Sequence, residues 1–292
     1  MTAAQAYEMG VRLLTESGFD RNEACPLTRL VLDAVTGLHH AHLTRPEAVL
    51  DKCAEVALST ALGELQRGKP LPYILGQWEF FGLPFRCDER ALIPRPETET
   101  LVEAAVERLK SKDKVLIADL GTGTGCITVS LAHALPNARV YATDASPQAL
   151  QLARDNASLN DVVDRVVFMT GTIGSWAGPL LREGLSGMFD AVLSNPPYIA
   201  AAEIETLQPQ IRDWEPRAAL DGGIDGLDCY RQIAAQCGLL LAPDGFLMVE
   251  LGAGQFDIVR EIFSAAAWRV APPIFDLAGI PRVLVAARDS SA

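Results

Sequence analysis

The sequence of 292 residues lacks several features that would place it in a special class of protein. Its six cysteines include no Cys-x-x-Cys pair, so reduced thiols are expected, and neither a disulfide framework nor a metal site is predicted. No apolar run approaches the roughly 18 residues of a membrane helix, because residues 239–242 are followed at once by Pro243. The first ten residues lack the basic and apolar regions of a secretory signal. A soluble, cytoplasmic protein without a membrane partner is therefore predicted.

Positive charge is also scarce in this chain. It has 25 lysines and arginines against 37 aspartates and glutamates, which gives a net charge of -12. An acidic surface repels phosphate backbones on average, so nucleic acid is not expected as a direct partner.

Hydrophobic residues make up 49% of the chain, enough to bury a large core. The length alone predicts roughly two domains.

The first domain is predicted to be a small helical bundle over residues 1–75. Apolar residues recur there at helical spacing, in three or four stretches. Asp20 and Glu23 form the pattern of a capping box at the start of one helix, and Gly37 is a typical stop for the same helix.

Residues 76–98 and 99–292 differ from the bundle in pattern. The first segment is aromatic and rich in glycine and proline, which predicts a β-hairpin linker centred near residues 82–84. From residue 99 onward, short apolar runs alternate with helical stretches, which predicts an α/β domain with a parallel sheet and helices on both faces. The expected strands cover residues 115–119, 140–144, 166–169, 191–194 and 246–250, with a closing pair at 268–270 and 283–287.

A glycine-rich loop follows the first of these strands. Asp119 ends the apolar run and precedes Gly121, Gly123 and Gly125, and a helix is expected from Cys126. Glycines let a ligand approach the backbone, and a helix N-terminus offers free N–H donors. A dinucleotide fingerprint needs a sixth-position glycine, which is absent here, and Asp119 would repel a pyrophosphate but suit an ammonium group. The loop therefore favours S-adenosyl-L-methionine over NAD; the alternative is a tight turn that binds nothing.

Asp144 closes the second strand, about 20 residues beyond the glycine loop. In Rossmann-like folds an acid at this place holds the hydroxyl pair of a ribose. The alternative is a capping role for the helix expected from Pro147, and the two roles are compatible.

The most informative motif is Asn195-Pro196-Pro197-Tyr198, at the end of the strand expected over residues 191–194. Two consecutive prolines fix the backbone and remove two N–H donors, which leaves carbonyl groups free to accept hydrogen bonds. The side-chain carbonyl of Asn195 adds an acceptor, and Tyr198 adds an aromatic face. These groups suit a planar –NH2, so they predict methylation of an amide or nucleobase nitrogen; a simple proline turn is the alternative.

These motifs together resemble those of the N5-glutamine methyltransferases that act on peptide chain release factors. The resemblance covers nearly the whole chain and includes LIPRPETE at residues 92–99 and EPRAAL at 215–220, followed by Asp221-Gly222-Gly223. It implies a Rossmann-like class I methyltransferase sheet over residues 99–292, with the bundle 1–75 docking the substrate and 76–98 as linker. It implies cofactor contacts from Asp119, Gly121, Thr122, Gly123, Thr124, Gly125, Asp144 and Asn195, and at the adenine from Thr172 and Ile173, or Trp176 if the alignment slips.

The resemblance also implies the reaction and its partners. A methyl group would pass from S-adenosyl-L-methionine to the glutamine side-chain nitrogen of the Gly-Gly-Gln motif in a release factor, leaving S-adenosyl-L-homocysteine. Asn195, Pro196 and Tyr198 would act in catalysis, and the same residues with Pro197 would bind the glutamine. Two alternatives stay open: a nucleic-acid methyltransferase acting on adenine N6 or guanine N2, which the acidic charge disfavours, and a non-catalytic cofactor-binding subunit, which the intact motif disfavours.

Overall fold

The computed structural model describes residues 1–171 and 174–288, and the chain forms two compact units. The first unit contains Met1–Gly76 together with Pro209–Trp214, and the second contains Gln77–Gln208 and Glu215–Ala292. Residues 209–214 thus interrupt the second unit in sequence and pack with the first. In the described ranges, no helix is both long and apolar enough to cross a membrane.

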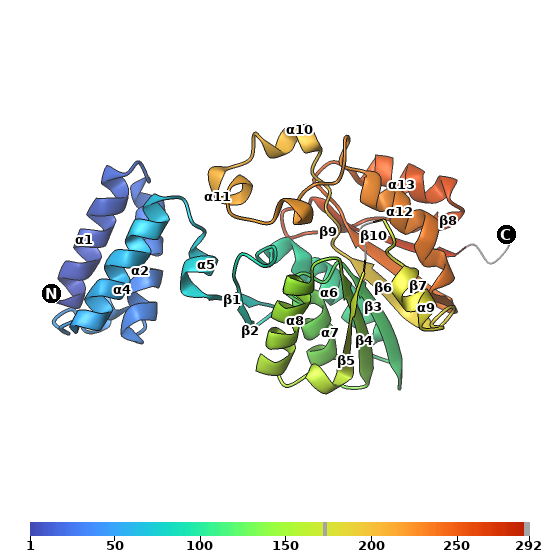
Figure 1. Cartoon of the computed structure of the whole chain (residues 1–292), viewed down its shortest axis with the longest axis horizontal. Helices are drawn as coiled ribbons and strands as arrows, with labels where there is room; N and C mark the ends of the chain where they lie inside the picture. The colour runs from blue at the N-terminus through green and yellow to red at the C-terminus, as the bar shows by residue number, and fades with distance from the viewer. Residues whose placement is uncertain (172–173, 289–292) are drawn as a thin grey trace. The chain divides into compact units, whose positions relative to one another are not determined.

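The first unit is helical, as the sequence predicts. Figure 1 shows its main helices side by side, and Asp20 caps the helix Arg21–Thr36 by accepting a hydrogen bond from the backbone of Glu23 at 2.9 Å. Gly37 ends the same helix with φ of +67°, so both local signals are confirmed. Trp214 belongs to this unit, where the Lys69 ammonium lies 5.6 Å from its ring centroid. The helices are α1 (Ala3–Glu16), α2 (Arg21–Thr36), α3 (Ala41–Thr44), α4 (Lys52–Gln66), α5 (Leu71–Leu75) and α11 (Pro209–Arg212).

A two-stranded hairpin opens the second unit, formed by β1 (Gln77–Phe80) and β2 (Leu83–Arg86). Its turn consists of Phe81 and Gly82, with φ of +54° and +70°, as a tight two-residue hairpin requires. The predicted centre is therefore slightly wrong, because Pro84 already pairs with Glu79 in the ladder. The following helix, α6 (Pro96–Leu109), begins within the segment predicted as linker, since a proline is favourable at the first helical position.

The second unit is built on an eight-stranded sheet with the order β5-β4-β3-β6-β7-β10-β8, and β9 pairs with β10. The strands from β5 to β7 run parallel, and β10 is antiparallel to its neighbours. The predicted α/β class and the closing strand pair are confirmed. The bounds are β3 (Val115–Leu120), β4 (Ala138–Asp144), β5 (Val166–Thr170), β6 (Phe189–Ser194), β7 (Leu241–Glu250), β8 (Trp268–Val270), β9 (Ile274–Phe275) and β10 (Pro281–Arg288).

Helices cover both faces of this sheet (Figure 1). On one face lie α6, α7 (Cys126–Ala134) and α8 (Pro147–Leu159), and on the other lie α12 (Asp228–Gln236) and α13 (Phe256–Ala265). The short helices α9 (Gly178–Arg182) and α10 (Ala201–Ile204) fall in connections. Fully buried Phe189, Tyr230 and Phe263 fill the core beneath the second face. Since β3 has β4 on one side and β6 on the other, the strand order reverses there, which is where α/β folds bind ligands.

Candidate active site

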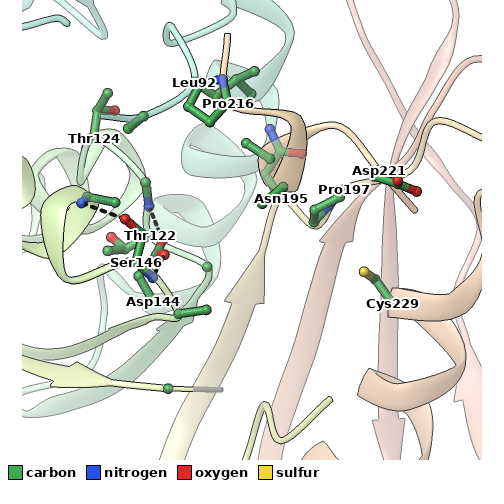
Figure 2. Close-up of a pocket in the computed structure, with 18 of the residues that line it drawn as sticks. Leu92, Thr122, Thr124, Asp144, Ser146, Asn195, Pro197, Pro216, Asp221 and Cys229 are labelled. Carbon is green, nitrogen blue, oxygen red and sulfur yellow. Dashed lines mark hydrogen bonds between the residues drawn. The ribbon is translucent and has the colours of Figure 1, made fainter. Parts of the chain in front are cut away.

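A cavity of about 690 Å³ lies at the carboxyl ends of β3, β4 and β6, within the size range of small-molecule sites. Figure 2 shows residues of four segments around it: the glycine loop, the end of β4, the segment after β6, and the segment near Pro216. Several residues predicted to form the site line it together. They are Gly121, Thr122, Gly123, Thr124, Asp144, Asn195 and Pro197.

The glycine loop takes a conformation that other residues would adopt at a cost. Gly121, Gly123 and Gly125 have φ of +76°, +56° and +81°. A Cβ atom at Gly125 would lie 3.0 Å from the Cβ atom of Ala153 in α8, so the loop packs closely against that helix. At Gly123 the nearest heavy atom would be 4.0 Å away, so this side of the loop is open toward the cavity. The loop therefore leaves its backbone accessible to a ligand.

Asp119 supports the loop from within the protein. Its side chain is fully buried, and Oδ2 accepts hydrogen bonds from the hydroxyls of Thr122 and Thr128, each at 2.7 Å. Burial raises the pKa of this carboxyl to about 6. In the described part of the chain Asp119 is not among the cavity-lining residues, so the geometry gives it a structural role, and direct contact with a ligand stays a prediction.

Asp144 lines the cavity and ties two segments together. Its Oδ2 accepts from the backbone of Gly123 at 2.9 Å, and its Oδ1 accepts from the backbone of Ser146 at 2.8 Å (Figure 2). The cap of α8 is Ser146, whose hydroxyl accepts from the backbone of Ala149. The helix-capping role considered as an alternative for Asp144 is therefore performed by Ser146. Burial raises the pKa of Asp144, although backbone N–H groups oppose the shift.

The segment after β6 is held from several sides. Asn195 lines the cavity, and its Nδ2 donates to the Thr98 hydroxyl at 3.1 Å. The carbonyl of Tyr198 accepts from Nε2 of Gln255 at 3.0 Å, which fixes the end of the motif. Burial raises the pKa of Tyr198 to about 12, so its phenol is neutral at physiological pH. Pro197 lines the cavity, whereas Pro196 and Tyr198 are not among its described lining residues.

The two motifs LIPRPETE and EPRAAL meet in a wall of the cavity. Arg95 forms an ion pair with Glu215, whose side chain is buried and whose Oε2 also accepts from the backbone of Ile93 at 3.2 Å. Ile93, Arg95 and Pro216 all line the cavity. Neither segment was predicted to form this wall, because no local pattern indicates a pairing across 120 residues. The only signal was that both segments belong to the motifs shared with the methyltransferase family.

The positions predicted to contact adenine divide into two groups. Thr172 and Ile173 lie outside the described residues. Trp176, the alternative position, lines the cavity, and its Nε1 donates to Oε1 of Gln232 at 2.9 Å. A Cβ atom at Gly121 would lie 3.2 Å from this ring. An aromatic ring therefore lies directly beside the glycine loop.

Comparison with known proteins identifies a matching domain family and close relatives of this chain. The Methyltransferase small domain family matches residues 98–211. A Bradyrhizobium diazoefficiens protein named release factor glutamine methyltransferase is 42% identical over 265 residues, covering 88% of this chain and 86% of the relative. A Moorella thermoacetica protein of the same name is 40% identical over 298 residues, covering 99% of each chain.

A solved structure shares the fold at low sequence identity. It is the hMettl16 catalytic domain in complex with the MAT2A 3'UTR hairpin 6, with a TM-score of 0.57 and 18% identity over 81% of this chain and 82% of that one. At this identity the likeness concerns the fold alone. It agrees with the class I methyltransferase architecture predicted from the sequence.

Proposed function

Because the chain belongs to the release factor glutamine methyltransferase family, we propose that its cavity binds S-adenosyl-L-methionine and the glutamine side chain of a peptide chain release factor. The family confirms the resemblance predicted from the motifs, and it makes the protein a methyltransferase. The observation that carries the proposal is the position of Asn195, which lines the cavity at the end of β6, next to the glycine loop after β3. The Asn195 acceptor for a substrate amide and a cradle for a cofactor thus open into one cavity.

The residues around the loop fit the proposed cofactor. Gly123 leaves room for close approach, and Asp144 presents a carboxylate that suits a ribose hydroxyl pair. Trp176 offers an aromatic face beside the loop, which suits a purine ring. Asp119 would act indirectly, by fixing Thr122 and Thr128 under the loop. When bound, S-adenosyl-L-methionine supplies an electrophilic methyl group on a sulfonium centre.

The chain's own contribution to the reaction is orientation and charge stabilisation. An amide nitrogen is a weak nucleophile because its lone pair is delocalised into the carbonyl group. Asn195 Oδ1 and the Pro196 carbonyl are acceptors for the two N–H groups, so they would hold the nitrogen in place and draw electron density onto it. Neutral Tyr198 would supply an aromatic face for the amide plane, although it lies behind the described lining of the cavity and would reach the amide only if the lining adjusts. No general base is assigned, since the product amide can lose its proton to water.

The second unit carries this cavity, and the first is proposed to dock the substrate protein. All described residues that line the cavity belong to the second unit. The helical unit has its own buried core, so it is a separate body on which a large substrate can bind. The proposed division is therefore chemistry in the second unit and recognition in the first.

The alternative functions fit the molecule less well. Methylation of adenine or guanine would require an acidic protein of net charge -12 to bind a polyanion. A silent cofactor-binding subunit would not need Asn195 held by Thr98 at the cavity wall. The family relationship supports the glutamine reaction over both.

The direct test is mass mapping of a release factor after incubation with the protein and S-adenosyl-L-methionine. We expect one added methyl group on the glutamine of its Gly-Gly-Gln motif. DNA and RNA serve as parallel substrates under the same conditions. Methyl transfer to a nucleic acid with none to the release factor would overturn the proposal, as would the lack of transfer to any of them.

A further inference from the structure

Glu250 is a buried carboxylate at the end of β7 that the reaction described above does not use. Ser194 pairs with Val249 in the parallel ladder of β6 and β7, so Asn195 and Glu250 follow them at the same edge of the sheet. Glu250 is 1% exposed, and its Oε2 has no hydrogen-bond partner among the described residues. A buried carboxylate is costly to the folded protein, so its place beside the candidate active-site asparagine calls for a physical explanation.

Thr98 connects the two side chains. It is 1% exposed in the first turn of α6, and its hydroxyl accepts a hydrogen bond from Nδ2 of Asn195 at 3.1 Å. Thr98 and Asn195 both lie near the Glu250 carboxylate, and their donor groups favour its charged form and lower its pKa. An ionised carboxylate can only accept, whereas a hydroxyl that accepts from Nδ2 still has its own proton to donate. Asn195 donates to Thr98, and the remaining proton of the Thr98 hydroxyl is free to be donated to the nearby Glu250 carboxylate.

We infer that Glu250 is a positioning residue which, directly and through Thr98, fixes the orientation of the Asn195 carboxamide with Nδ2 toward Glu250 and Oδ1 toward the cavity. A flipped carboxamide would place Oδ1 against a carboxylate, where two acceptors face each other with no proton between them. It would also offer a donor to the substrate –NH2, which itself needs acceptors. In the described structure Asn195 Oδ1 receives no hydrogen bond, so it is available for the glutamine. This use of Oδ1 rests on the proposed function; the orientation itself does not.

The ionisation of Glu250 makes this device sensitive to pH. Burial is the main cause that raises its pKa to about 7; Thr98 and Arg282 on β10 oppose the rise, and Glu97 on α6 adds to it. A protonated Glu250 becomes a donor, so Thr98 can reverse its hydroxyl and the preference for one carboxamide orientation is lost. The orientation is therefore enforced as pH rises through about 7. The other ionisable neighbours are neutral there because burial raises their pKa values; these are Cys126, Tyr198 and Tyr230.

The first test measures turnover of a Gly-Gly-Gln peptide. Thr98→Val keeps the shape of the side chain but removes the hydroxyl, so kcat should fall by about tenfold, the scale of one hydrogen bond, with little change in KM. Thr98→Ser restores the hydroxyl and should recover most of the loss. Thr28→Val is the matched control, since Thr28 is a fully buried threonine of the first unit whose hydroxyl has no partner in the described structure. An unchanged kcat in Thr98→Val would overturn the inference.

The second test needs no substrate, so it separates this inference from the proposed function. In protein labelled with ¹⁵N-asparagine, the side-chain amide signal of Asn195 can be identified by its loss in Asn195→Ala. We expect this signal to shift with pH, with a midpoint near 7, and the shift to vanish in Glu250→Gln. A signal that does not titrate, or that titrates equally in Glu250→Gln, would overturn the inference even if the protein methylates release factors. Loss of release-factor methylation alone would instead overturn the proposed function.

Discussion

At the scale of single residues, Asn195 is where a structural and a chemical role can be separated. Its Nδ2 is already bound by Thr98, whereas Oδ1 is left for a substrate. Asn195→Ala should therefore retain the fold and most of the cofactor affinity, while kcat falls by about 10²–10³, the scale for one preorganised polar contact to a reacting group. Turnover would be measured at saturating cofactor, with circular dichroism as the control for folding. Near-normal turnover would remove the chemical role given to this side chain.

Asn195→Asp probes the same site through its charge. The variant keeps an acceptor of the same shape but loses the donor to Thr98 and places a second carboxylate beside Glu250. An extra negative charge at the cavity would favour a sulfonium-bearing reactant over a transition state in which that charge is neutralised. We expect cofactor affinity equal to or tighter than that of the wild type, together with slower turnover. Weaker cofactor binding measured by titration calorimetry would contradict this electrostatic account.

Asp144 is expected to act on the cofactor and not on the substrate. Asp144→Ala removes an acceptor from the cavity and frees the backbone of Gly123, so cofactor binding should weaken by about 1–3 kcal/mol, the scale for hydrogen bonds to a charged group. Titration calorimetry with S-adenosyl-L-methionine measures this directly. Asp164→Ala, at an exposed position away from the cavity, is the matched control. Equal cofactor affinities in the two variants would show that Asp144 only holds the backbone and does not contribute to cofactor binding.

At the scale of elements, Gly125 sets the distance between α7 and α8. Gly125→Ala combines a left-handed backbone with a contact of 3.0 Å to Ala153, so unfolding free energy should fall by about 2–4 kcal/mol, the sum of strain and overpacking. Gly279→Ala is the matched control: its φ of +76° carries the strain, but no atom lies within 4 Å of the added Cβ. Urea unfolding should show a cost of about 1 kcal/mol for the control. Equal costs would mean that α8 moves to accommodate the methyl group.

The elements that could be predicted from sequence are those specified by neighbouring residues. Asp20 with Glu23 and Gly37 bounded a helix correctly because each acts within one helical turn. Seven of the eight strands of the sheet were found for the same reason, since each contains an apolar run. The two-residue strand β9 was not predicted, and β7 begins five residues before the predicted strand 246–250. Glu250 could not be recognised as a site residue, because as the last residue of a strand it looks like any polar strand end. Its importance arises only when β7 pairs with β6 and brings it beside Asn195.

At the scale of the whole molecule, the first unit is expected to serve recognition. Removing Met1–Gly76 and replacing Pro209–Trp214 with a short flexible linker should raise KM for a release factor far more than KM for a Gly-Gly-Gln peptide. The linker is needed because Trp214 would otherwise lose its partners in the helical unit, among them Lys69. Steady-state kinetics on the two substrates measures the difference. Equal losses on both would show that the first unit is needed only for folding.

The return of residues 209–214 to the helical unit has a consequence for how the polypeptide can be cut. The chain crosses between the units at three peptide junctions, after Gly76, Gln208 and Trp214. A protease nick after Gly76 would divide the polypeptide into residues 1–76 and residues 77–292. The first fragment would still pack against residues 209–214, which belong to the helical unit but lie on the second fragment. The two fragments of the nicked protein would thus stay associated without a covalent link. The denaturant concentration at which they separate on gel filtration would measure how strongly residues 209–214 bind the helical unit.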